Sequence, residues 1–244
     1  MPRVLLVRLE APLVAFGGEA VDALGVVTDF PARSMLTGLL ANALGWHRHE
    51  REKLARLQER IVFAARIDRE GQRLTDFQTA AIGGTDRGWT TRGRPEGRAG
   101  GAGTYLGPHI RRRDYHSDAA VTVALTLRPA GEEPDLDALA AALDEPARPL
   151  FIGRKPCLPA WPLRQGLAEA ASLTAALLGA GLERDPTGPD IRLLLPVEEE
   201  AGPADRVDFV TDERDWRSGV HGGARRLRFR SLPRAAFPEA PPCP

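Results

Sequence analysis

Residues 119–127 read Ala-Ala-Val-Thr-Val-Ala-Leu-Thr-Leu and alternate branched apolar side chains with small or polar ones. A period of two is typical of a β-strand with one buried face. Residues 3–9, Arg-Val-Leu-Leu-Val-Arg-Leu, form a second run of branched residues and indicate a buried or half-buried strand. We therefore predict a sheet that contains both segments, and the segments around them decide which fold the sheet belongs to.

The segments between these two strands predict two helices and two further strands. An apolar stretch with helical spacing opens at Pro31 and ends at Gly45, and a charged helix follows it. The two further strands are expected to pair with each other across the turn at Arg69–Gly71. Residues 10–29 are rich in glycine, and we expect them to be irregular. The expected bounds are Pro31–Gly45 and Glu50–Gln58 for the helices, and Ile61–Asp68 and Leu74–Ile82 for the strands.

A short amphipathic helix at Asp135–Leu143 and a short strand at Pro149–Ile152 follow the alternating strand. The resulting order, strand, helix, strand, strand, helix, strand, is that of a ferredoxin-like fold. The predicted fold class is therefore α+β, with this core in residues 1–165. Residues 166–244 are expected to pack on the core as a small β-rich region with one helix. Its expected elements are a helix near Leu167–Leu178 and strands at Ile191–Leu195, Val207–Thr211 and Arg225–Leu232.

Residues 83–113 differ abruptly in composition from the segments on either side. They carry seven arginines and two acidic residues, a net charge of +5. A glycine-rich backbone can approach a ligand closely, and arginine forks bind phosphates, so this composition suits a nucleic-acid backbone. Segments of this length inside a compact domain are usually functional or disordered. Contact with RNA or DNA and a solvated loop are both consistent with the composition. The seven arginines are Arg87, Arg92, Arg94, Arg98, Arg111, Arg112 and Arg113.

A second basic segment is the predicted strand Arg225–Leu232. As a strand it places Arg226, Arg228 and Arg230 on one face, and Leu227 and Phe229 on the other. An edge strand with its charges in solvent explains this pattern as well as a binding stripe does.

The bulk composition narrows the class of protein. Of the 244 residues 43% are hydrophobic and 27% are charged, enough to bury a core. Lys+Arg and Asp+Glu both total 33, so the whole-chain charge says nothing of nucleic acid. No apolar stretch is long enough to span a bilayer, and residues 1–9 are too short for a signal peptide. Two cysteines make no disulfide framework, which indicates the cytoplasm. No motif for a metal, a nucleotide or another cofactor is present.

One pair of neighbours could carry out catalysis. Tyr115 and His116, with a basic group nearby, are residue types that can catalyse metal-independent RNA cleavage. In that reaction a base removes the 2′-hydroxyl proton. An ordinary surface or hydrogen-bonded histidine is the simpler interpretation of His116.

Five short blocks of the sequence together resemble a known family. They occur in the family's order across residues 4–165 and are similar to the CasD-type subunits of type I-E CRISPR Cascade complexes. The block at residues 149–157 matches its Gly-Arg-Lys/Arg-Ser-Cys signature most closely. The five blocks are Val7–Pro12, Phe30–Ser34, Asp76–Thr79, Arg113–Ala119 and Pro149–Cys157.

The resemblance implies an RRM-like core with a protruding thumb at residues 83–113. It implies a non-catalytic protein that binds the 5′ handle of CRISPR RNA (crRNA). The implied protein partners are a Cascade backbone subunit and the large PAM-recognising subunit, and contact with target DNA is indirect. Cys157 is expected to be buried and structural. The residues expected to bind RNA are Arg33, Ser34, Arg92, Arg94, Arg98, Arg111, Arg112, Arg113, Tyr115, Arg154 and Lys155.

Two other functions remain open at this point. The first is a crRNA-processing endoribonuclease, as in the related type I-C subunit, with Tyr115, His116 and Lys155 as catalytic groups. The second is a general single-strand nucleic-acid binder outside CRISPR. Incubation with repeat RNA tests the first, and the need for a specific handle sequence tests the second.

Overall fold

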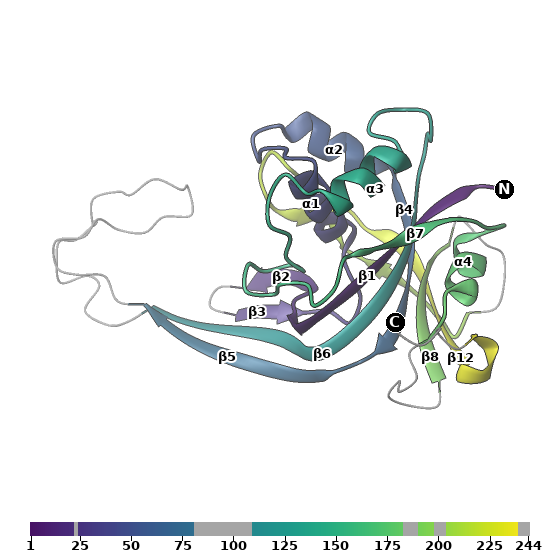
Figure 1. Cartoon of the computed structure of the whole chain (residues 1–244). Coiled ribbons are helices and arrows are strands. Elements are labelled where there is room, and N and C mark those ends of the chain that lie inside the picture. Colours follow the sequence, from purple (N-terminus) through teal and green to yellow (C-terminus); the bar gives the residue numbers. More distant parts are fainter. Residues whose placement is uncertain (22–23, 81–108, 183–189, 198–203, 239–244) are drawn as a thin grey trace, which may run out of the picture.

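The structure is a computed structural model that describes residues 1–21, 24–80, 109–182, 190–197 and 204–238 (Figure 1). A strongly curved sheet forms the centre of the molecule, and helices cover both of its faces. The helices are α1 (Arg33–Ala43), α2 (Arg51–Arg60), α3 (Leu136–Asp144) and α4 (Leu173–Gly179), with a short 3₁₀ helix at Arg234–Ala236. The class is α+β, as predicted.

The strands of the described residues form one ten-stranded sheet and one small hairpin. In the large sheet β2, β3, β6, β4, β8, β12 and β9 are neighbours in this order, β1 pairs with β6 and β7, and β5 pairs with β6. The strands are β1 (Arg3–Val14), β2 (Gly17–Val21), β3 (Leu24–Val27), β4 (Ile61–Arg69), β5 (Gln72–Ala80), β6 (His109–Leu127), β7 (Arg164–Glu169), β8 (Asp190–Pro196), β9 (Arg206–Val210) and β12 (Arg225–Pro233). The hairpin pairs β10 (Glu213–Arg214) with β11 (His221–Gly222).

The predicted alternation in residues 119–127 is confirmed. Val121, Val123 and Leu125 enter a core that α1, α2 and α3 cover, whereas Ala124 enters a second core that α4 covers. Strand β6 begins ten residues earlier than expected, at His109, and pairs with four other strands. A strand with this many neighbours is the centre of the fold.

Strand β5 does not form the expected hairpin with β4. It continues in the direction of β4 and pairs with β6, from Gln72 opposite Ser117 to Ala80 opposite His109. Gly71 makes this possible, because its φ is +69° and a Cβ there would lie 2.2 Å from the Ser117 carbonyl oxygen. Strands β5 and β6 therefore form a two-stranded ribbon that leaves the body of the protein (Figure 1).

Most of the described residues between 10 and 27 lie in strands, which corrects a second prediction. Strand β1 runs on to Val14, and β2 and β3 form a hairpin beside it. Strand β3 lies parallel to β6, with Leu24 opposite Arg112 and Gly25 opposite Arg113. The β6 strand thus supplies hydrogen-bonding partners that the glycine-rich sequence alone does not reveal.

The expected strand at Pro149–Ile152 is absent, and residues 164–169, expected to be a loop and the start of a helix, form β7. Ile152 is buried, but the chain turns at Gly153, where φ is +88° and a Cβ would lie 1.8 Å from the Ala15 carbonyl oxygen. Strands β7, β1, β6 and β4 lie side by side and antiparallel.

Residues 166–244 supply β8, β12 and β9, which extend the sheet beyond β4, and α4 covers them. These strands agree with the predicted elements, and the predicted helix is present but begins at Leu173, not near Leu167. The expected boundary at residue 165 falls inside β7, and the division into a core and a C-terminal region packed on it stays a prediction. No helix in the described ranges is long and apolar enough to cross a membrane.

Candidate nucleic-acid interface

A groove with a volume of about 670 Å³ opens on α1, beside the base of the β5–β6 ribbon. Its other walls are the β2–β3 hairpin, the loop at residues 148–154, the turn between α1 and α2, and the β10–β11 hairpin. We call it the basic groove. Its described lining contains no acidic residue, and its polar, aromatic and glycine residues include Arg48, Arg148, Arg154, Arg214, Trp46, Trp216, His47, His221, Gly17, Gly18, Gly25, Gly38 and Gly153.

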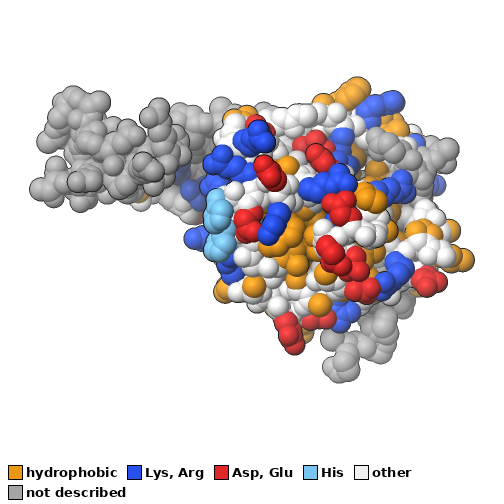
Figure 2. All heavy atoms as spheres, turned by 90° about the horizontal axis from the view of Figure 1, so that it is seen from above, with side chains coloured by type: hydrophobic (Ala, Val, Ile, Leu, Met, Phe, Trp, Pro, Cys, Tyr) orange, Lys and Arg blue, Asp and Glu red, His pale blue; other side chains and the backbone are white. Residues whose placement is uncertain are grey.

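This lining is chemically suited to single-stranded nucleic acid. Arginine forks neutralise phosphates, and tryptophan rings offer faces on which bases stack. Glycines let a ligand approach the backbone closely. Figure 2 shows Lys and Arg side chains gathered beside the histidines at the end where the ribbon leaves the body, whereas acidic and basic side chains mix elsewhere on that face.

Arg154 and Tyr115, both predicted to bind RNA, lie together at one end of the groove. The Arg154 guanidinium carbon is 4.9 Å from the centroid of the Tyr115 ring. Arg154 also donates hydrogen bonds to the carbonyl oxygens of Asp114, at 2.7 Å, and Gly25, at 2.9 Å. The Tyr115 ring is 2% exposed, so it supports Arg154 and is itself covered. Lys155 follows on the surface and is exposed.

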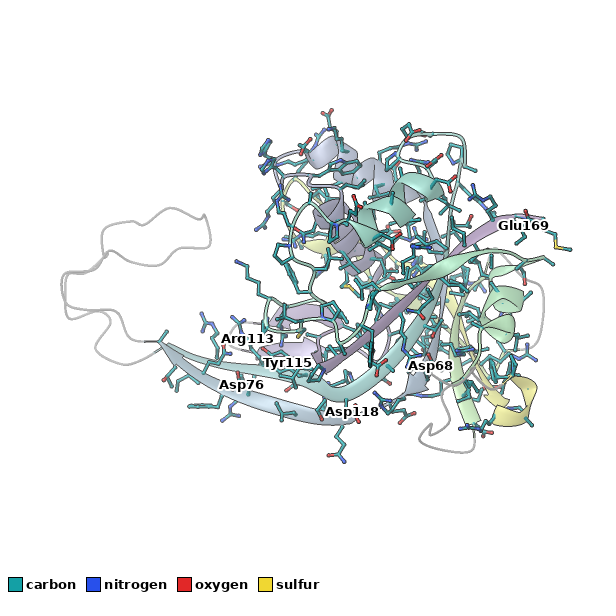
Figure 3. All side chains as sticks on the ribbon, in the orientation of Figure 1. Asp68, Asp76, Arg113, Tyr115, Asp118 and Glu169 are labelled. Carbon is teal, nitrogen blue, oxygen red and sulfur yellow. The ribbon has the colours of Figure 1, made fainter. Side chains whose placement is uncertain are left out.

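The three consecutive arginines of the ribbon do not share one face. Neighbouring side chains of a strand point to opposite faces, so Arg111 and Arg113 lie on the face of Tyr115, and Arg112 lies on the other. All three are exposed. Arg113 packs beside Gly25 next to Arg154, and its backbone lies opposite Asp76 across the ribbon (Figure 3). Arg92, Arg94 and Arg98 lie outside the described residues.

Arg33 and Ser34, predicted to hold a phosphate at the start of α1, already bind carboxylates and a carbonyl of the same chain. The N-cap residue, Ala32, has no side-chain cap. Asp212 caps the helix instead. Its carboxylate accepts a hydrogen bond from the Arg33 amide, at 3.0 Å, and its backbone carbonyl accepts one from the Ser34 amide, at 2.9 Å. The Arg33 side chain donates to Glu213 at 2.6 Å. Burial and the nearby Arg225 lower the pKa of Arg33, which the carboxylates of Glu213 and Asp212 oppose.

Comparison with known proteins assigns the chain to a family. The family model described as "CRISPR-associated protein (Cas_Cas5)" matches residues 4–228. The chain belongs to the Cas5 family.

Individual relatives agree with this assignment. The "CRISPR system Cascade subunit CasD" of Escherichia coli (strain K12) is 31% identical over 194 residues, which cover 78% of this chain and 81% of that protein. A solved structure titled "Crystal structure of Cas protein" is 29% identical, with a TM-score of 0.63 over 98% of this chain and 100% of that one. A chain of a "CRISPR RNA-guided surveillance complex" shares the fold, with a TM-score of 0.65, 22% identity, and coverage of 94% and 89%. The resemblance predicted from the sequence is confirmed.

The three groups of the nuclease hypothesis do not meet in this Cas5-family chain. Tyr115 and His116 are neighbours on β6 and point to opposite faces of it. The buried Tyr115 ring lies under Arg154, and His116 Nε2 is 3.1 Å from the Thr28 carbonyl oxygen. Lys155 lies on the exposed loop that follows Arg154. No contact among those described joins two of these three side chains.

Sequence reasoning missed most of the basic groove of this Cas5-family chain. Trp46 and Arg48 lie about a hundred residues before Arg148 in the sequence, and Arg214 and Trp216 come from the C-terminal third. No group of three or more His, Cys, Asp or Glu among the described residues could hold a metal ion. The useful signal was arginine next to an aromatic residue in a turn, as in Trp46-His47-Arg48. Cys157 is fully buried, as predicted.

Proposed function

We propose that this chain is a non-catalytic RNA-binding subunit of a Cascade complex in antiviral defence. In this role the basic groove and the adjoining ribbon hold the 5′ handle of crRNA. The basic groove carries the proposal, because it combines arginines, tryptophans and close backbone approach and has no acidic residue in its described lining. Single-stranded RNA needs these features, and a small neutral ligand does not.

The proposed core is ferredoxin-like, that is, RRM-like. Strand order β7, β1, β6, β4, with α1 between β1 and β4 and α3 between β6 and β7, supports it. In this chain α4 and the buried residues around Leu193 cover one face of the sheet. We therefore assign RNA binding to the helix-bearing side and its rim, where the basic groove lies.

Within this function, Arg154 forms the end of the groove nearest the ribbon, and Arg111, Arg113 and Lys155 continue the positive surface outward. Residues 83–113 act as a thumb that lies against RNA between this subunit and a backbone neighbour. The proposed protein partners are the backbone subunit and the large PAM-recognising subunit. Target DNA is reached only through the complex, and the setting is cytoplasmic.

The direct test measures binding of the purified protein to a labelled single-stranded RNA that carries the handle of its own CRISPR repeat. We expect tighter binding to this RNA than to the same RNA with a scrambled handle, by at least tenfold. Equal affinity for both RNAs would favour the general single-strand binder. A protein that binds neither RNA, alone or with its backbone partner, would contradict the proposal.

The same preparation tests the absence of catalysis. The protein is incubated alone with full-length repeat RNA in EDTA, and the RNA is resolved on a denaturing gel. We expect intact RNA, because Tyr115, His116 and Lys155 are not arranged around one phosphate. Cleavage that is lost in Tyr115→Phe or His116→Ala would establish the endoribonuclease instead.

A further inference from the structure

Two arginines from distant parts of the chain meet over one glycine at the far end of the basic groove. Arg48 lies in the turn between α1 and α2, and Arg214 lies in β10. Both approach Gly219, in the β10–β11 hairpin. A Cβ built on Gly219 would be 3.1 Å from one terminal nitrogen (Nη2) of Arg214 and 3.6 Å from that of Arg48. Two like charges are thus held close together.

Among the described residues, no carboxylate forms an ion pair with either guanidinium. Other arginines around the hairpin do have such partners: Arg225 binds Asp212 at 2.7 Å, and Arg33 binds Glu213 at 2.6 Å. Burial, and then the charge of Arg48, lower the pKa of Arg214. The Arg214 guanidinium also lies over the Trp216 ring, with its central carbon 5.6 Å from the ring centroid. An anion placed here would relieve the repulsion.

The framework around this pair is firmly built. Gln58 fixes β10 by accepting from the Arg214 amide and donating to its carbonyl, both at 3.1 Å, and by accepting from Trp216 Nε1 at 3.2 Å. Glu50 fixes the opposite turn by accepting from the His47 amide at 2.6 Å. The backbone positions of the two arginines are therefore fixed before any ligand arrives, and a site with a fixed backbone loses less entropy on binding.

We propose that Arg48 and Arg214 clamp one backbone phosphate of single-stranded RNA, and that the Trp216 ring beside them stacks on a neighbouring base. This clamp rests on the proposed function and assigns the β10–β11 hairpin a direct part in it. A carboxylate from a protein partner is the competing occupant. The phosphate is favoured because the site opens into the basic groove, which continues past Gly38 to Arg154 with no acidic residue among those described.

The test compares the double variant Arg48→Ala/Arg214→Ala with a matched double variant, Arg51→Ala/Arg217→Ala. The control removes the same charge from α2 and the same hairpin, at exposed residues that do not line the groove. Binding to an oligouridylate of eight nucleotides and to the handle RNA is measured from about 50 to 300 mM salt. We expect the clamp variant to bind both RNAs about 10- to 100-fold more weakly. Its slope of log affinity against log salt should fall by about 0.7, for one phosphate of a single strand. The control should retain most of the affinity.

A second measurement locates the phosphate. Single linkages of the handle RNA are replaced by neutral methylphosphonate, one at a time. In the unchanged protein, replacement of one particular linkage should weaken RNA binding by as much as the clamp variant does. In the clamp variant, replacement of the same linkage should weaken binding no further. Trp216→Phe should reduce the fluorescence quenching that RNA causes, while Trp46 of the same groove still contributes.

The outcomes separate the clamp from the broader proposal. If handle RNA binds specifically but the clamp variant matches its control in affinity and salt slope, the clamp is refuted and the proposed function stands. If the handle is not preferred, the proposed function fails, and the oligouridylate data still decide whether the clamp exists. A clamp variant that binds RNA normally but no longer joins the backbone subunit would assign the pair to a protein carboxylate and overturn the proposal.

Discussion

The guanidinium carbon of Arg154 lies over Tyr115, 4.9 Å from the ring centroid, while the guanidinium donates hydrogen bonds to the carbonyl oxygens of Gly25 and Asp114. One side chain therefore ties the loop at residues 148–154 to both β3 and β6. Gly25 allows this, because a Cβ there would lie 2.7 Å from the Arg154 Nη2 atom. Arg154 thus stabilises the contact between this loop and the sheet, and it also places a positive charge in the groove.

Substitution Arg154→Ala should lower the free energy of unfolding by about 1.5–3 kcal/mol, the usual value of charge-assisted hydrogen bonds. Arg154→Lys should recover little of it, because one ammonium cannot reproduce a planar fork between two carbonyls. Urea unfolding measures both. Lys155→Ala is the control: it should leave stability unchanged and reduce only the salt slope of RNA binding, by about 0.7. Equal stability of the Arg154 and Lys155 variants would show that the Arg154 hydrogen bonds do not contribute to the free energy of unfolding.

Asp212→Ala should destabilise the protein by about 3–5 kcal/mol, because it leaves the Arg225 guanidinium buried without its partner. The same change removes the acceptor for the Arg33 amide, so the hairpin wall of the groove should loosen and RNA affinity should fall. Urea unfolding and RNA titration measure the two effects. Asp208→Ala, which breaks the exposed pair with Arg206, should cost less than about 1 kcal/mol. Similar losses in the two variants would refute the special role of Asp212.

Glu50 gives the stability a dependence on acid pH. Hydrogen bonds from Lys53 and from the His47 amide lower the pKa of Glu50 from 4.5 to about 2. A carboxyl with a depressed pKa contributes stability that is fully present above its unfolded value and is lost as pH falls through its folded value. The difference in unfolding free energy between the unchanged protein and Glu50→Gln should therefore shrink between about pH 5 and pH 2. Glu52→Gln, on the same helix, controls for loss of a carboxylate. A difference that stays constant over this range would contradict the assignment.

Replacement of residues 81–108 by Asn-Gly should leave the body of the protein folded. Ala80 and His109 are direct partners across β5 and β6, and Asn-Gly is a favoured two-residue hairpin turn. Stable assembly with crRNA and the backbone subunit should be lost, because the replacement removes Arg92, Arg94 and Arg98. Thermal unfolding and gel filtration of the mixture measure these effects, with a shortened 198–203 connection as control. Normal assembly with a nuclease-protected handle would show that residues 81–108 are dispensable.

Elements with a strong local pattern could be predicted from the sequence. The apolar spacing that ends at Gly45 found α1, and the alternation of Val121, Val123 and Leu125 found the centre of β6. In both segments the apolar residues mark the face that is buried, and burial of that face determines whether the segment forms a helix or a strand. The Gly153-Arg154 block likewise indicated a site, because its residues are adjacent in the chain.

Features that depend on distant partners could not be predicted. Strand β7 contains Gln, Gly, Ala and Glu, which favour strands poorly, and it forms because β1 offers an open edge. The prediction that β5 pairs with β4 was wrong, because the sequence of β5 does not show that β6 is long enough to pair with both β4 and β5. Arg48 and Arg214 lie in opposite halves of the sequence, so only the fold makes them neighbours.

The hydrogen bonds that join the segment before the β10–β11 hairpin to the start of α1 also determine the order in which the walls of the groove form during synthesis. Residues 33–54 leave the ribosome early, but the wall that holds Arg214 and Trp216 follows only when residues 212–222 have emerged. An incomplete nascent chain therefore presents a groove open on one side, with Arg48 facing no second cation. Under the proposed function, RNA that needs both walls would be captured only by chains that extend past residue 222, and shorter products would not withdraw it from assembly.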